Sequence, residues 1–223
     1  MDWSMFSFGE AVLKYYCSQR WCVNLALDDD YNLYSIALES SKSWILSICF
    51  RILGQIVRGK IVRENFDIPE EFEVSFDLYL NSKRTDSAEG HFRIFRLTNT
   101  TNDNGNHGDR IFRLVAVNRE NNDNRFRFLF SVGDDPNYVF KTDTGLPILE
   151  WIHVKVKQVN VSGTYKLQVF INDSMLHEVD NPSPNVYRNV TAYANEPYSR
   201  PADGTLINLR ILPGEHCNFS KLP

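Results

Sequence analysis

The sequence predicts an all-β fold in which two antiparallel sheets pack face to face as a sandwich. Short runs of alternating apolar and polar residues recur from about residue 54 to residue 213, which is the pattern of half-buried strands. Turns rich in Asn, Asp and Gly separate these runs, and little of the region shows helical periodicity. The 223 residues are 43% hydrophobic and 13% aromatic, so they supply a core large enough for one sizeable β-domain.

The chain divides into three parts. Residues 1–53 are an N-terminal extension of unclear structure with a short helix expected around residues 9–19, residues 54–215 are the β-domain, and residues 216–223 are a C-terminal tail. The longest apolar run, Trp44 to Val57, is shorter than a membrane span and is interrupted by Arg51, which favours a buried helix or strand. A remnant of an internal signal anchor is the alternative interpretation.

The strands expected in the β-domain follow one another at short spacing, as in sandwiches and barrels. Their expected ranges are 55–64, 71–80, 91–98, 111–118, 125–132, 137–142, 151–159, 164–172, 175–180, 186–194 and 205–212.

The clearest element is a β-hairpin over residues 151–172. Apolar residues occupy one face of each of its strands, and the same alternation appears in the 71–80 strand. A face of this kind needs a second sheet to cover it. The predicted core residues are Phe72, Val74, Phe76, Leu78, Ile152, Val154, Val156, Leu167, Val169 and Ile171.

The length of the hairpin loop predicts the register of its two strands. A four-residue loop over residues 160–163 places Val156 opposite Leu167 and Lys157 opposite Lys166. Two lysines directly opposite each other are tolerated only on a solvated face. The lysine face of the hairpin is therefore expected to be exposed.

This hairpin resembles the central hairpin of concanavalin A-like jelly rolls. The resemblance covers residues 54–213. The superfamily that it points to includes the lectin-like modules of animal ectodomains, such as laminin G-like and pentraxin-like domains. It implies a jelly-roll sandwich with a lectin-type role, although one fold hosts many functions. The residues that carry it are Leu146, Glu150-Trp151, Val154-x-Val156, Gly163-x-Tyr165-x-Leu167-x-Val169-x-Ile171-Asn172, Phe72-x-Val74-x-Phe76-x-Leu78, Gly108-Asp109-Arg110, Asn189 to Pro197 and Ala202 to Leu209.

Charge and cysteine content restrict the classes of partner. The net charge of −4 gives no support for a nucleic-acid partner, which would need a basic stripe. Cys17, Cys22, Cys49 and Cys217 form no CxxC pair and lack zinc spacing with histidine, so a zinc knuckle is not expected. Two disulfides are compatible with this count, and all three connectivities stay open.

N-glycosylation sequons favour the secretory route. The chain shows no clear signal peptide, because its start lacks a basic segment and the following apolar run is broken by charges. We nevertheless expect a secreted or extracellular protein without a membrane span, with a glycan first of all at Asn160. The sequon asparagines are Asn99, Asn160, Asn172, Asn189 and Asn218.

Catalytic signatures are incomplete, so no catalytic residue is predicted. Glu71, Glu73 and Asp77 share one face of the 71–80 strand, where residues two apart are separated by roughly 6.5–7 Å. That spacing is compatible with the separation of about 5–9.5 Å between glycosidase carboxylates. However, the E-x-D-x-x-E signature of hydrolases with this fold is absent, and no aromatic residue is expected on that face to stack against a sugar. A solvated strand face is therefore the preferred interpretation.

The best candidate binding site is a rim formed by two loops. Residues 99–110 and 133–137 connect strands of a predicted meander, which brings both loops to the same end of the sandwich. Their oxygen donors suit a hard cation, and calcium is the one cofactor that the sequence suggests; ordinary Asx turns are the alternative. The predicted ligand-binding residues are Asp103, Asn104, Asp109, Asp134 and Asp135, and the four aspartates are the predicted metal ligands.

Two groups of basic residues are candidate sites for sulfated glycans. Lys155, Lys157 and Lys166 share the solvated face of the hairpin, and Arg125 and Arg127 share a face of another strand. Lysines that discourage edge-to-edge pairing of sheets are the alternative explanation.

These features predict an extracellular recognition or adhesion module that binds a glycan or an extracellular protein without catalysis. A glycan-cleaving enzyme on the same fold is one alternative. A structural domain of a larger ectodomain is the other.

Overall fold

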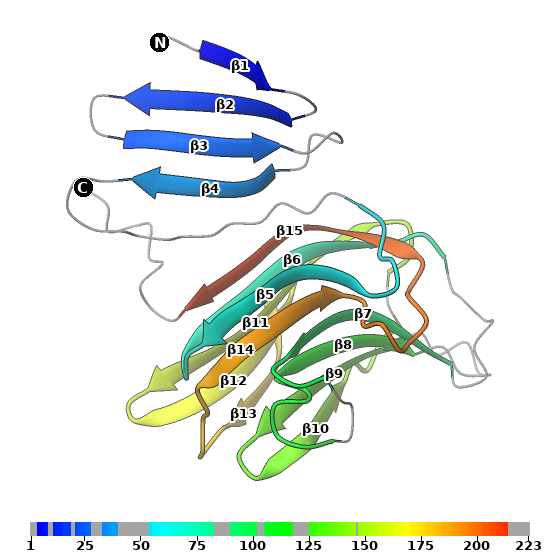
Figure 1. Cartoon of the computed structure of the whole chain (residues 1–223). Helices are drawn as coiled ribbons and strands as arrows, with labels where there is room; N and C mark the ends of the chain where they lie inside the picture. The colour runs from blue at the N-terminus through cyan, green and yellow to red at the C-terminus, as the bar shows by residue number, and fades with distance from the viewer. Residues whose placement is uncertain are drawn as a thin grey trace.

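The structure, a computed structural model, describes residues 54–82, 90–101, 105–117, 125–145 and 147–213 in full, and the backbone of residues 4–8, 11–18, 21–27 and 33–39. The described residues form three antiparallel sheets and contain no helix. Two of the sheets build the sandwich from residue 60 onward (Figure 1). The predicted all-β sandwich is confirmed, and its two antiparallel layers agree with a concanavalin-like jelly roll.

The N-terminal strands form a sheet of their own. Its strands are β1 (Ser4–Phe8), β2 (Ala11–Ser18), β3 (Trp21–Leu27) and β4 (Leu33–Glu39), in that order. The helix expected around residues 9–19 is wrong, because residues 11–18 pair with a strand on each side. That segment is rich in β-branched and aromatic residues, which favour strands. Its backbone register sets Cys17 opposite Cys22, whereas Cys49 and Cys217 lie outside the described residues.

The sandwich consists of a six-stranded and a five-stranded sheet. The six-stranded sheet has the spatial order β10 (Asp135–Lys141), β9 (Arg125–Val132), β8 (Phe112–Val117), β7 (His91–Thr98), β14 (Tyr187–Ala194) and β5 (Lys60–Ile68). The five-stranded sheet has the order β13 (Ser174–Asp180), β12 (Thr164–Ile171), β11 (Trp151–Val161), β6 (Phe72–Leu80) and β15 (Gly204–Pro213). Most expected ranges are correct within two residues. The first strand begins later than expected because Arg58 and Gly59 form a turn, in which Gly59 has φ 71°.

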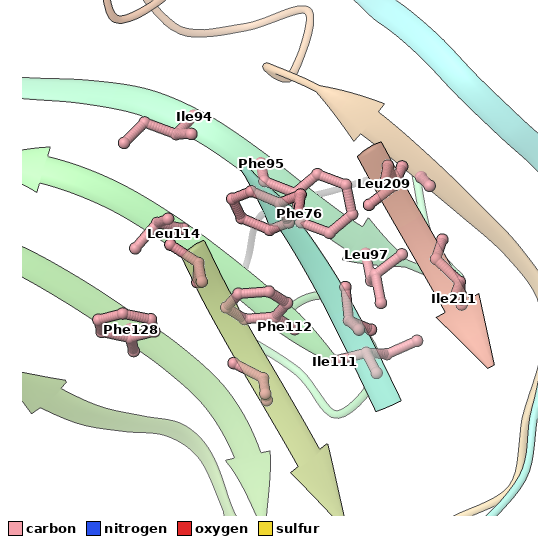
Figure 2. Close-up of a cluster of buried hydrophobic side chains, with 14 of the residues drawn as sticks. Phe76, Ile94, Phe95, Leu97, Ile111, Phe112, Leu114, Phe128, Leu209 and Ile211 are labelled. Carbon is pink, nitrogen blue, oxygen red and sulfur yellow. The ribbon is translucent and has the colours of Figure 1, made fainter. Parts of the chain in front are cut away.

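The core fills the space between the two sheets. All the predicted core residues are buried except Ile171, which is partly buried and packs against the others. Phe76 of the five-stranded sheet meets Phe95 of the six-stranded sheet with 5.2 Å between ring centroids (Figure 2). Phe112 continues this aromatic layer and stacks on Phe130 at 5.5 Å. The alternation in the sequence therefore predicts the inner faces correctly.

The hairpin register differs from the prediction by two residues. Val156 lies opposite Val169 and not opposite Leu167. The loop contains two residues instead of four, because Ser162 and Gly163 both have positive φ, 53° and 89°. Two central residues with positive φ are the signature of a type I′ turn, which suits the twist of a hairpin. A shift of two residues leaves every side chain on the same face of the sheet, so the predicted core residues of the hairpin are correct although the register is wrong.

The predicted opposition of Lys157 and Lys166 is wrong for the same reason. In the observed register Lys157 lies opposite Gln168, and Lys166 lies opposite Val159. The lysine face of the hairpin therefore contains no directly opposed like charges between β11 and β12.

Candidate functional site

The two rim loops lie together at one end of the six-stranded sheet. Residues 99–111 join β7 to β8, and residues 133–134 join β9 to β10. The side chain of Asn137 links the loops, because its oxygen accepts a hydrogen bond from Arg110 and its Nδ2 donates to the Gly105 carbonyl at 3.1 Å. The expected meander is thus correct for these strands.

Asp109, one of the predicted metal ligands, is buried within its loop. Its carboxylate accepts hydrogen bonds from the Thr100 hydroxyl and from the backbone N–H of Asn106, the latter at 2.9 Å. Its own carbonyl accepts hydrogen bonds from Arg96. These contacts hold the loop against β7.

The other predicted rim ligands have different surroundings. Asp134 and Asp135 are exposed, and Asp135 accepts a hydrogen bond from the N–H of Asn137 at 2.8 Å, which is an Asx turn. Asp103 and Asn104 lie outside the described residues. Among the residues that the structure describes, no three His, Cys, Asp or Glu side chains are grouped to hold a metal ion. Calcium at the rim stays a prediction.

The outer face of the five-stranded sheet carries an aromatic pair that the strand pattern alone does not predict. Tyr79 continues the alternation of Asp77 along β6, and Trp151 is its direct partner on β11. The two rings lie 5.2 Å apart between centroids at an angle of 50°. Trp151 is 49% exposed, a large value for a tryptophan. The expectation that this face lacks an aromatic residue is therefore wrong.

A polar cluster lies directly beside the aromatic pair. His153 Nδ1 is 2.7 Å from Asp77 Oδ1, and the Nδ2 of Asn208 donates to Asp77 Oδ2 at 2.5 Å. Asn208 has φ 54° and sits at an irregularity in β15, which turns its amide toward Asp77. Because Nδ1 of His153 faces Asp77, the opposite ring nitrogen, Nε2, faces away from the carboxylate.

The strand register fixes the distance between the two groups. Thr205, Tyr79 and Trp151 are successive partners on β15, β6 and β11, and the next outward-facing row on these strands contains Asp77 and His153. Rows two residues apart on a strand are separated by roughly 6.5–7 Å. We define the aromatic face as Tyr79, Trp151, Asp77, His153 and Asn208.

Backbone contacts stabilise the position of His153. Its carbonyl accepts from the N–H of Asn172, and its N–H donates to Asn172 Oδ1, each at 2.8 Å. Asn172 and Asp173 have φ 49° and 60° and form the turn between β12 and β13. Trp151 and His153 therefore lie on a regularly paired, anchored strand, while Asn208 joins them from the irregular part of β15.

The remaining carboxylates of the 72–80 strand and its flank make contacts that suit a structural role. Glu71 Oε2 accepts from the Asn160 N–H at 3.3 Å, and Glu73 lies opposite Lys157 in the β6–β11 register. Both oxygens of Asp77 are already hydrogen-bonded. Absence of catalysis stays a prediction.

The lysines of the hairpin have acidic or aromatic neighbours. Lys155 Nζ lies 2.7 Å from Asp173 Oδ1, and Lys166 Nζ lies 2.8 Å from Glu178 and 3.0 Å from Asp180. The hydrogen bond from Lys155 holds the pKa of Asp173 below its ordinary value. This neutralisation argues against the lysine face as a site for sulfated glycans.

A buried ionic cluster fastens the segment after β14 to the outer face of the six-stranded sheet. Glu196 Oε2 lies 2.8 Å from both Arg96 Nη1 and Arg113 Nη2, and Oε1 lies 2.9 Å from Arg93 Nε. The Ser199 hydroxyl donates to Oε1 at 2.6 Å. Burial alone would raise the pKa of Glu196, but the arginines and Ser199 outweigh it, so the pKa lies below its ordinary value.

Four of the five sequon asparagines lie within the described residues, and all four are exposed: Asn99, Asn160, Asn172 and Asn189. Asn218 lies outside them. These positions would accommodate a glycan, and glycosylation itself stays a prediction. Within the described residues no helix is long and apolar enough to cross a membrane.

Two sequence features point to the aromatic face in retrospect. Tyr79 falls on the same alternating positions as Asp77, and Trp151 begins the polar face of the hairpin. Their contact depends on the pairing of β6 with β11, which are far apart in the sequence.

No family model matches the chain, and no curated protein is similar to it in sequence. Its fold is similar to that of the heptameric SAP-like pentraxin from Limulus polyphemus, with 14% identity over 68% of this chain and 67% of that chain and a TM-score of 0.43. It is similar to the CBM40 module of the Ruminococcus gnavus IT-sialidase bound to α2,3-sialyllactose, with 13% identity over 71% of this chain and 92% of that chain and a TM-score of 0.44. It is also similar to the endo-1,3-β-glucanase from Streptomyces sioyaensis, with 12% identity over 84% of this chain and 77% of that chain and a TM-score of 0.45. Similarities at this level do not identify a ligand.

Proposed function

We propose that this protein binds an uncharged oligosaccharide through the aromatic face. The observation that carries the proposal is the half-exposed Trp151, paired with Tyr79 and one row away from the His153–Asp77–Asn208 cluster. Aromatic side chains offer an apolar surface to the C–H face of a sugar ring. A few fixed polar groups beside such a surface provide orientation and specificity.

The spacing of the two groups suits one sugar residue. A ring stacked on Trp151 would lie within roughly 7 Å of the neighbouring polar row, which is the separation of alternate residues on a strand. His153 Nε2 and the side-chain carbonyl oxygen of Asn208 then face the sugar hydroxyls. An acidic sugar would bring its own carboxylate close to Asp77, so an uncharged ligand is favoured.

Recognition without cleavage is the activity that this arrangement supports best. Asp77 uses both of its oxygens to orient His153 and Asn208, as expected for a group that positions others. The four exposed sequon asparagines support an extracellular setting, where such a module would serve in recognition or adhesion.

A glycan array tests the proposal, using the wild type, Trp151→Ala and Tyr198→Ala. Tyr198 is 65% exposed outside the aromatic face and is the matched control. We expect the wild type to bind uncharged oligosaccharides, Tyr198→Ala to retain this binding, and Trp151→Ala to lose at least about tenfold in affinity, which corresponds to about 1.4 kcal/mol. Equal binding by the wild type and Trp151→Ala would reject the site. Release of new reducing ends from a bound glycan would favour the glycan-cleaving alternative.

A further inference from the structure

Leu149 has an unusual backbone conformation at the point where the chain enters β11. Its φ is 65°, which lies in the left-handed region. Eight non-glycine residues of the described part of the chain have positive φ, and the seven others are all Asn, Asp or Ser. Short polar side chains tolerate this region because they bond to the local backbone. A leucine lacks this compensation, so its backbone conformation is strained.

The packing of the chain does not account for a leucine at this position. The Leu149 side chain is 65% exposed, so it contributes little to the core. The backbone is held by the Leu149 N–H, which donates to the Leu80 carbonyl at 2.9 Å, and any residue other than proline supplies that donor. An asparagine would fit the left-handed conformation better and would bury no less of the core. A role at the surface is therefore the better explanation for this side chain.

Leu149 lies at one end of the aromatic face. Its backbone partner, Leu80, is the neighbour of Tyr79, and Leu149 itself is two residues from Trp151. Two residues span at most about 7 Å, so the leucine is close to the tryptophan. On the other side of Trp151 lies the row of polar residues that contains His153. The tryptophan thus stands between an apolar neighbour and a polar one.

A fixed polar group lies at the same end of the face. Asn81 follows Leu80, and its N–H donates to the Asp203 carbonyl at 2.9 Å. The Nδ2 of Asn81 donates to Asp203 Oδ1 at 3.1 Å, which fixes the side-chain amide in an exposed position. The oxygen of this amide can accept a hydrogen bond from a sugar hydroxyl. An apolar surface with an oriented polar group beside it is the composition of a ligand subsite.

We propose that Leu149 forms a second sugar subsite beside Trp151, so that the aromatic face recognises a chain of more than one sugar residue. This inference rests on the proposed function of that face. A second ring over Leu149 would remove its apolar surface from water, which favours binding. The ring on Trp151 is then an inner residue of the chain, with one neighbour over Leu149 and hydroxyls toward His153. Affinity therefore rises with the length of the oligosaccharide.

Calorimetric titration with neutral oligosaccharides of increasing length tests the subsite. The probes are the cello-, malto-, laminari- and manno-oligosaccharides, each from the monosaccharide to the tetrasaccharide. The key variant is Leu149→Asn, and Leu149→Met is the conservative variant that keeps an apolar side chain. Val186→Asn is the matched control, because Val186 is an apolar residue 51% exposed in the segment before β14 of the other sheet.

We expect the wild type to bind the tetrasaccharide of at least one series more tightly than its monosaccharide. Leu149→Asn should lose about tenfold in affinity for that tetrasaccharide and keep the affinity for the monosaccharide. Leu149→Met and Val186→Asn should bind like the wild type. The melting temperature of Leu149→Asn should be no lower than that of the wild type, because asparagine relieves the backbone strain.

The outcomes distinguish this inference from the proposed function. If Trp151→Ala loses the tetrasaccharide and Leu149→Asn binds it like the wild type, the subsite is rejected and the aromatic face stands. If the wild type binds none of the four series, the proposed function fails and the subsite fails with it. Equal losses of affinity for the monosaccharide and the tetrasaccharide in Leu149→Asn would contradict a separate subsite. A melting temperature several degrees below that of the wild type would assign Leu149 to packing and overturn the inference.

Discussion

Glu196 is the residue on which three arginines converge, and two of them, Arg96 and Arg113, are almost completely buried. Removing one partner of a buried ionic cluster leaves the others uncompensated in a medium of low polarity. We therefore expect Glu196→Gln to lower the free energy of unfolding by about 3–5 kcal/mol, as measured by urea denaturation. Glu178→Gln, in an exposed ion pair, is the control and should have a far smaller effect. Equal losses in the two variants would contradict this role.

The same residue predicts how stability depends on pH. The pKa of Glu196 in the folded state lies below its ordinary value of 4.5. A carboxyl of this kind contributes its full stabilisation above the unfolded-state pKa and loses it as pH falls through the folded-state pKa. Wild-type stability should therefore decline below about pH 4.5, and Glu196→Gln should show a shallower decline. Parallel curves of unfolding free energy against pH would show that another group is responsible.

Single residues differ in how far the sequence predicts their role. Val154 and Leu167 are correctly predicted to lie in the core, because alternation along one strand decides which side is buried. The roles of Trp151 and Tyr79 depend on a contact between two strands that are distant in sequence. Local sequence patterns do not indicate which strands pair with each other, so the contact between Trp151 and Tyr79 is found only in the structure.

The turn of the central hairpin carries a prediction at the scale of an element. Ser162 holds φ 53°, a left-handed conformation that Asn adopts more readily than Ser. Ser162→Asn creates the Asn-Gly pair preferred in type I′ turns and should raise stability by up to about 1 kcal/mol. Ser162→Ala is the control and should give no gain. Both substitutions remove the sequon of Asn160, so the wild type and the variants are all expressed in bacteria, where none of them carries a glycan at Asn160. A neutral or destabilising Ser162→Asn would argue against the two-residue turn.

The rim loops provide the second test at this scale. Asp109 supports its loop through internal hydrogen bonds, so its removal would affect the fold as well as any ion. The exposed Asp134 and Asp135 are better probes. If the predicted calcium site exists, millimolar calcium should raise the melting temperature of the wild type, and the double variant Asp134→Asn with Asp135→Asn should abolish the shift. An unchanged melting temperature of the wild type would remove the calcium prediction.

Strand ranges are predictable within a few residues, but loop length and register are not. The sequence shows where alternation stops, yet it does not show that Ser162 adopts a left-handed conformation and shortens the loop. The N-terminal segment over residues 11–18 has no clear period, and its pairing with strands on both sides decides against the expected helix. Tertiary pairing thus overrides weak local signals.

At the scale of the whole sandwich, the two outer faces differ in chemistry. The five-stranded sheet presents the aromatic pair beside the ion pair of Lys155 with Asp173, and on the six-stranded sheet Glu196 joins three arginines in a buried cluster. Both faces rest on one shared core, which keeps each set of side chains in fixed rows.

The most direct test of the central claim is to locate a bound sugar. A crystal structure with an uncharged oligosaccharide selected on the array would show which face it occupies. We expect a sugar ring stacked on Trp151, with a hydroxyl within hydrogen-bonding distance of His153 Nε2. A sugar bound at the rim loops or elsewhere on the sandwich, with Trp151 uncovered, would contradict the proposed site.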